Sequence, residues 1–136
     1  TKIDGIGTQM HVSCYENPAT QKSKEEHVVK MLELMAASGK LVKISELDMG
    51  YVDANGNSVP TASMTEAQHQ AMAAYYQFIV SKYFEIIPAA QQYGITQWCL
   101  TDAPADSGWR GGEPVGLWDA NYSRKHTYAG FAEGLK

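Results

Sequence analysis

The 136-residue chain has no long hydrophobic run, no cluster of basic residues and only two cysteines. No apolar stretch reaches the roughly 20 residues that a membrane-spanning helix needs, and no signal-peptide pattern is present, so no membrane segment is predicted. With 11 Lys and Arg against 15 Asp and Glu, the net charge of −4 argues against nucleic acid and anionic membranes as partners. Cys14 and Cys99 lack metal-type spacing; a disulfide between them stays open, and free thiols are the favoured interpretation.

The chain begins at Thr1 rather than Met, which suggests a processed product or a piece of a longer chain. Its composition, 44% hydrophobic and 19% charged, is typical of a globular protein, and the length suffices for one hydrophobic core. No shift in composition marks an internal boundary. Residues 1–136 are therefore expected to belong to one domain.

Three passages of the same kind follow one another, each with an apolar strand, a polar loop and a helix. The strands are expected at residues 4–13, 40–49 and 94–100. The first helix is expected to begin at Ser23, where "SKEE" forms a capping box, and to end near Gly39. The alternation predicts an α/β fold with parallel strands.

The later elements carry clear start and stop signals. Thr65 and Gln68 form a second capping box, which opens a long helix that Pro88 should end. Asn55-Gly56 indicates a tight turn, and "YAGFAEGLK" closes the chain as a short helix. Three such units are about half of an eight-unit barrel, which needs about 250 residues.

The strands carry polar side chains where parallel folds place their chemistry. Because alternate residues of a strand face the same side, three pairs are expected to project together: Gln9 with His11, Glu46 with Asp48, and Thr96 with Trp98. If the first two strands are neighbours, His11 can lie between the two acids and fix their orientation. The structural alternatives are an ion pair for the acids, a core position for His11 and packing for Trp98.

These motifs resemble glycoside hydrolase family 10, the endo-β-1,4-xylanases, over essentially the whole chain. "DGIGTQMH" resembles the family's sixth strand, and "ISELD" resembles its seventh, with Ser45 in place of the common threonine. "GITQWCLTD", "GWR" and "PVGLWDANYSRKHTYAGFAEGL" resemble the eighth strand, its loop and the last helix. The resemblance implies a partial (β/α)8 TIM barrel, namely its last three β/α units.

The resemblance implies a role for each matching residue. Glu46 would be the nucleophile of a retaining xylan hydrolysis, supported by His11 and Asp48. The implied substrate-binding residues are Gln9, Trp98, Trp109 and Arg110. Sugar rings stack on such aromatic walls, and the chemistry needs neither metal nor cofactor. Secretion or a periplasmic location is expected, because xylan is too large to import.

One essential part of the family's machinery is missing. Retaining hydrolysis needs a second carboxylic acid about 5–5.5 Å from the nucleophile, and in this family it lies on the fourth strand. The carboxylates Asp102, Asp106, Glu113 and Asp119 are expected to be loop caps or turn residues. The chain alone is thus expected to be inactive, and to associate with itself or with the missing N-terminal barrel segment.

Two rival functions remain open. One is a non-catalytic carbohydrate-binding remnant that uses Trp98, Trp109 and Trp118 as a sugar platform. The other is a β-1,4-glucanase of related barrel fold.

Overall fold

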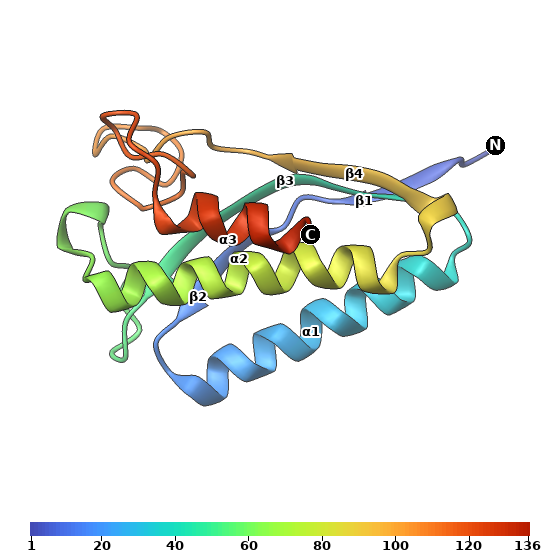
Figure 1. Cartoon of the computed structure of the whole chain (residues 1–136), viewed down its shortest axis with the longest axis horizontal. Coiled ribbons are helices and arrows are strands. Elements are labelled where there is room, and N and C mark those ends of the chain that lie inside the picture. Colours follow the sequence, from blue (N-terminus) through green and yellow to red (C-terminus); the bar gives the residue numbers. More distant parts are fainter.

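The computed structural model describes all 136 residues and shows parallel strands with three helices along one face of the sheet (Figure 1). In chain order the strands and α-helices are β1 (Gly5–Thr8), β2 (His11–Tyr15), α1 (Pro18–Ala37), β3 (Leu41–Val52), α2 (Glu66–Ile86), β4 (Gln92–Gln97) and α3 (His126–Gly134). Short 3-10 turns lie at Thr61–Ser63 and Ala89–Gln91. The α/β class with a parallel sheet is confirmed. None of the helices combines the length and the apolar character needed to cross a bilayer.

Strand β3 is the centre of the sheet. Its first part pairs with β1 and its second part with β2, while β4 lies on its other side. The single strand expected at 4–13 is therefore two strands. The break falls at Met10, whose φ of 57° lies in the left-handed region and interrupts an extended chain. The other two strands differ at their ends: β3 continues to Val52, and β4 begins at Gln92 and stops at Gln97.

The first helix begins five residues earlier than expected, at Pro18. The Asn17 side chain accepts hydrogen bonds from the backbone N–H groups of Ala19 and Thr20, and proline suits the first helical position. The "SKEE" capping box that predicted a start at Ser23 lies inside the helix, because this earlier cap takes precedence. The capping box at Thr65 and the end of α2 before Pro88 were predicted correctly.

An extra residue in the middle of β3 changes which side chains face the helices. From Ile44 to Leu47, β3 uses three steps where β4 uses two, from Ile95 to Gln97. Val42 and Ile44 are buried before this bulge, and Leu47 and Met49 are buried after it. A strand without the bulge would place Glu46 on the same side as Val42 and Ile44, under the helices. The bulge thus re-aims Glu46 and Asp48 toward the other face of the sheet.

The hydrophobic core lies between the sheet and the helices. Leu32 of α1 and Met72, Tyr76 and Ile79 of α2 are fully buried in one cluster with the core residues of β3. Tyr83 completes it, and its hydroxyl donates to the carbonyl oxygen of Val42 at 2.7 Å. No helix covers the opposite face of the sheet (Figure 1). That open face carries the polar cluster described next.

Candidate active site

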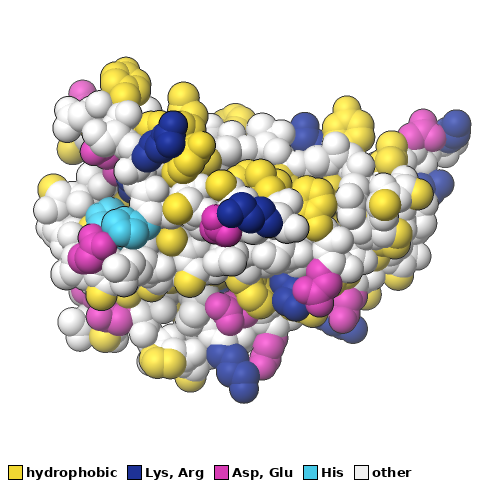
Figure 2. Space-filling model, in the orientation of Figure 1, with side chains coloured by type: hydrophobic (Ala, Val, Ile, Leu, Met, Phe, Trp, Pro, Cys, Tyr) yellow, Lys and Arg dark blue, Asp and Glu magenta, His cyan; other side chains and the backbone are white.

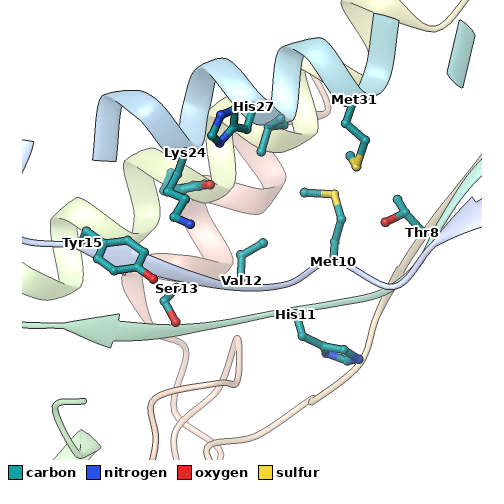
Figure 3. A pocket seen from close by; sticks show the side chains of 11 residues that line it. Thr8, Met10, His11, Val12, Ser13, Tyr15, Lys24, His27 and Met31 are labelled. Carbon is teal, nitrogen blue, oxygen red and sulfur yellow. The ribbon is translucent and has the colours of Figure 1, made fainter. Parts of the chain in front are cut away.

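His11 lies between the two acids of "SELD". Its Nδ1 is 3.0 Å from Oδ1 of Asp48, and its Nε2 is 2.9 Å from Oε2 of Glu46. The register pairs His11 directly with Asp48 across β2 and β3. Figure 3 shows His11 projecting from its strand on the side away from α1, whereas Met10 projects toward α1. The predicted convergence of these three side chains is confirmed.

The two bonds of His11 require two hydrogens. Both ring nitrogens face carboxylate oxygens, so the second hydrogen lies either on the ring or on one of the two carboxylates. In either state the ring ties the orientation of Glu46 to that of Asp48. The second carboxylate oxygen of Glu46, Oε1, has no hydrogen bond within the chain.

Asp48 is the fixed point of the cluster, because its side chain is fully buried and accepts hydrogen bonds from four groups. Besides His11, the donors are Nη1 of Arg110 at 3.0 Å, Nε1 of Trp109 at 2.8 Å and the Cys99 thiol at 3.7 Å. Burial and the nearby Asp48 raise the pKa of Cys99 to about 11, so the thiol stays protonated and can donate at neutral pH. Both cysteines are free.

Arg110 reaches Asp48 from the loop after β4. Four of its five N–H groups are used, because it also donates to the Val12 carbonyl oxygen, to Oγ of Ser13 and to Glu113. A Cβ atom at Gly50 would collide with the guanidinium, so only glycine leaves this space open. Sequence reasoning missed this second support, although the glycine directly after "SELDM" was its signal.

The two tryptophans predicted near the cleavage point flank His11. The Trp109 ring centroid is 4.6 Å from that of His11, and the Trp98 centroid is 6.1 Å away, both edge to face. Trp118, in contrast, packs against Tyr128 and the core, so the three tryptophans do not form one platform. Gln9 is exposed at the break between β1 and β2 and makes no hydrogen bond to the cluster.

A buried ion pair anchors the loop that carries Trp109. Asp102 accepts hydrogen bonds from Lys125, from the hydroxyl of Thr61 at 2.6 Å and from the Gly116 N–H at 3.0 Å. Burial lowers the pKa of Lys125, while Asp102 opposes this shift. Asp102 is therefore a structural residue, but it belongs to a buried ion pair and is not the simple loop cap or turn residue that was expected. Asp119 is a structural residue as well, since it accepts from the backbone N–H groups of two residues in its own turn.

The fold and the cluster together define a class of protein. The parallel sheet has helices on one face, as in part of a β/α barrel, and its other face carries two acids beside two tryptophans. The chain belongs to glycosyl hydrolase family 10, whose model matches residues 1–134. It is 31% identical to endo-beta-1,4-xylanase Xyn10C of Cellvibrio japonicus over 98% of its length, and 30% identical to endo-1,4-beta-xylanase B of Humicola insolens over 99%.

Solved structures place the same fold in larger proteins. A mutant of xylanase 10C from Cellvibrio japonicus, in complex with xylopentaose, matches 98% of the chain with a TM-score of 0.75 and 28% identity. The catalytic core of a xylanase A matches 99% of the chain with a TM-score of 0.71 and 26% identity. The chain covers only 27% and 41% of these two structures, and 23% and 36% of the two relatives above.

Proposed function

We propose that the chain is the C-terminal part of a retaining endo-1,4-β-xylanase, consisting of the last three β/α units and carrying the nucleophile side of the site. The observation that supports this most directly is the hydrogen-bonded series Glu46–His11–Asp48 on the open face of the sheet. A retaining glycosidase needs one carboxylate held at a fixed position against the sugar. Residues 1–136 would then be one portion of a single catalytic domain.

In this proposal Glu46 is the nucleophile. Its Oε1, free of hydrogen bonds, would form a bond to the anomeric carbon of xylose while the bond to the leaving oxygen breaks, and that oxygen would take a proton from the general acid of the missing N-terminal segment. His11 holds the other oxygen, and Asp48 holds His11. Water would later release the sugar from Glu46 with retention of configuration.

The remaining proposed site residues have different tasks. Trp98 and Trp109 would wall the sugar, and Gln9 would contact it from the rim. Arg110 was expected to bind substrate, but four of its five N–H groups already bind other residues, so only one is left for a sugar. We therefore assign to Arg110 chiefly the task of holding Asp48.

The purified chain is expected to hydrolyse xylan at a rate at least about 10²-fold below that of a complete family member, since a general acid alone contributes about 10² to 10⁴-fold. Reducing-sugar release from xylan measures this, with Cellvibrio japonicus Xyn10C as the reference. Glu46→Ala serves as the blank for contaminating activity. Vigorous hydrolysis by the chain that Glu46→Ala abolishes would contradict the assignment of a missing acid.

The open edges of the sheet favour a partner that completes the barrel. A hollow of about 450 Å³ lies between α1 and the free edge of β2, lined by residues such as Lys24, His27 and Met31 (Figure 3). A second hollow near the start of the sheet is lined by residues that include Ile6 and Tyr93. We propose that a second copy or the N-terminal barrel segment covers these surfaces.

Light scattering tests this association. The isolated chain is expected to have the molecular mass of a dimer or a larger species at micromolar concentration, because exposed strand edges and apolar hollows favour association. Adding the N-terminal segment of a family member should replace that species by a one-to-one complex. A stable monomer that ignores the added segment would refute the proposal.

The substrate of the proposed enzyme is xylan or a xylo-oligosaccharide, and a β-1,4-glucanase is the alternative. Since the polymer cannot enter a cell, we also propose a secreted or periplasmic location. A non-catalytic sugar-binding role remains a candidate because Trp98 and Trp109 are exposed. Comparing products from xylan and cellulose separates the enzymatic possibilities, and binding without turnover in the completed barrel would favour the binding role.

A further inference from the structure

The turn that leads into α3 contains the sequence "NYS", residues 121–123. An asparagine followed two positions later by serine or threonine, with any residue except proline between them, is the acceptor signal for an N-linked glycan. The chain has four asparagines: Asn17, Asn55, Asn57 and Asn121. The first three lack a serine or threonine at the second following position. Asn121 is therefore the one candidate acceptor among them.

A three-residue pattern arises easily by chance, so its structural setting decides whether a glycan can be attached. Asn121, Tyr122 and Ser123 are all exposed. Their backbone bonds use only N–H and carbonyl groups, and neither the side-chain amide of Asn121 nor the hydroxyl of Ser123 makes a hydrogen bond within the chain. Both side-chain groups that define the acceptor signal are thus free and point to a site on the surface.

The turn keeps its shape without these two side chains. Oδ1 of Asp119 accepts hydrogen bonds from the backbone N–H groups of Asn121 at 2.8 Å and Ser123 at 2.9 Å. The Asp119 N–H in turn donates to the Ser123 carbonyl oxygen at 2.9 Å. A glycan on the Asn121 amide would leave all of these bonds in place. The fold therefore tolerates a large group at this position.

The turn also lies apart from the surfaces that the rest of a barrel would cover. No residue from 119 to 124 lines either of the two hollows proposed for association. Figure 1 shows the loop between β4 and α3 at the end of the sheet opposite the N-terminus. A bulky glycan at position 121 would leave those association surfaces free.

Exposed hydrophobic side chains lie beside the acceptor. Tyr122 is 78% exposed, and Leu100, which borders the same hollow, is 62% exposed. Figure 2 shows hydrophobic side chains on the surface over this loop. Exposed apolar groups that gather in one place favour aggregation, whereas a glycan is bulky and solubilising. A glycan on Asn121, directly before Tyr122, would shield part of this surface.

We propose that Asn121 is the acceptor of an N-linked glycan when the chain passes through a secretory pathway that contains an oligosaccharyltransferase. The donor would be a lipid-linked diphospho-oligosaccharide. Nδ2 of Asn121 forms a bond to C1 of the first sugar and loses one proton, while the bond from C1 to the diphosphate oxygen breaks and the lipid diphosphate leaves. This inference rests on the proposed secretion of the protein and not on xylan hydrolysis.

Intact-mass measurement on the whole chain, secreted from yeast behind a host signal peptide, tests the proposal. We expect a mass above the 14.9 kDa of the polypeptide, and peptide N-glycosidase should remove the excess and leave aspartate at position 121. Asn121→Gln and Ser123→Ala should each abolish the excess, and Ser123→Thr should keep it. Asn55→Gln is the matched control, since Asn55 is exposed in another turn but lacks the acceptor signal.

Medium and cell extract are both analysed, so that a retained chain is also measured. A chain with the mass of the bare polypeptide would refute the proposal, and so would an excess mass that persists in Asn121→Gln. The glycosylated and enzymatically deglycosylated chains should unfold at the same urea concentration, and a lower midpoint for the glycosylated form would show that the turn does not accommodate the glycan. Failure of a completed barrel to hydrolyse xylan would overturn the proposed function and leave these masses unchanged.

Discussion

Asp48→Ala is expected to lower the free energy of unfolding by about 3–5 kcal/mol, the range observed when one partner of a buried ion pair is removed. The carboxylate is fully buried and accepts from His11, Arg110 and Trp109. Alanine would remove the buried carboxylate that Nη1 of Arg110 binds, although Arg110 keeps its ion pair with Glu113, and would leave the Trp109 indole N–H unpaired. His11 lies on β2, whereas Arg110 and Trp109 lie on the loop after β4. The change would therefore loosen the contacts of β3 with β2 and with this loop at once.

Urea denaturation of the chain and its variants measures this effect. Asp106→Ala is the matched control, since Asp106 lies in the loop that carries Trp109 and Arg110, is exposed and makes no side-chain hydrogen bond. This control should change the free energy of unfolding by less than about 0.5 kcal/mol. Asp48→Asn tests the charge separately, because the amide keeps the shape and turns one acceptor into a donor that faces other donors. If Asp48→Ala unfolds like the Asp106 control, the buried network does not hold the sheet and its loop together.

The sequence predicted the acid cluster because its members obey simple rules. His11, Glu46 and Asp48 are polar residues within apolar strands, and parallel strands bring such residues to the same part of a sheet. The prediction gave the right neighbours for an incomplete reason, however. Strict alternation would have grouped Glu46 and Asp48 with the buried Val42 and Ile44, and only the bulge in β3 separates them.

The bulge could not be predicted from local patterns, and the only local sign of the Arg110 network is Gly50, which does not identify the residue that fills the space beside it. A bulge follows from pairing with both neighbouring strands, and the sequence of β3 alone contains no residue that requires it. Arg110 reaches Asp48 across 62 positions of sequence, and the loop conformation that brings it there depends on the distant ion pair of Asp102 with Lys125. The start of α1 differs: Asn17-Pro18 was a readable signal, and the later capping box at Ser23 obscured it.

Glu46→Gln is expected to abolish hydrolysis in a completed barrel. The chain would be joined to the N-terminal part of Cellvibrio japonicus Xyn10C, which is 31% identical where the two overlap. In this chimera, glutamine keeps an acceptor for His11 but cannot form the covalent bond to the sugar. Loss of a nucleophile lowers kcat by about 10⁴ to 10⁶-fold, and KM should change little because binding depends on other residues.

Initial rates on xylohexaose give kcat and KM for the parent chimera and its variants. Glu85→Gln is the control, because this exposed glutamate on α2 pairs only with Lys82. The proton spectrum of fresh products should show retained β-configuration in the parent chimera, as a covalent intermediate requires. If an active parent chimera loses less than about 10-fold in kcat with Glu46→Gln, another group performs the attack, since removal of a true nucleophile is far more costly. The hydrogen-bonded series from Glu46 to Asp48 would then serve the stability of the sheet instead of its chemistry.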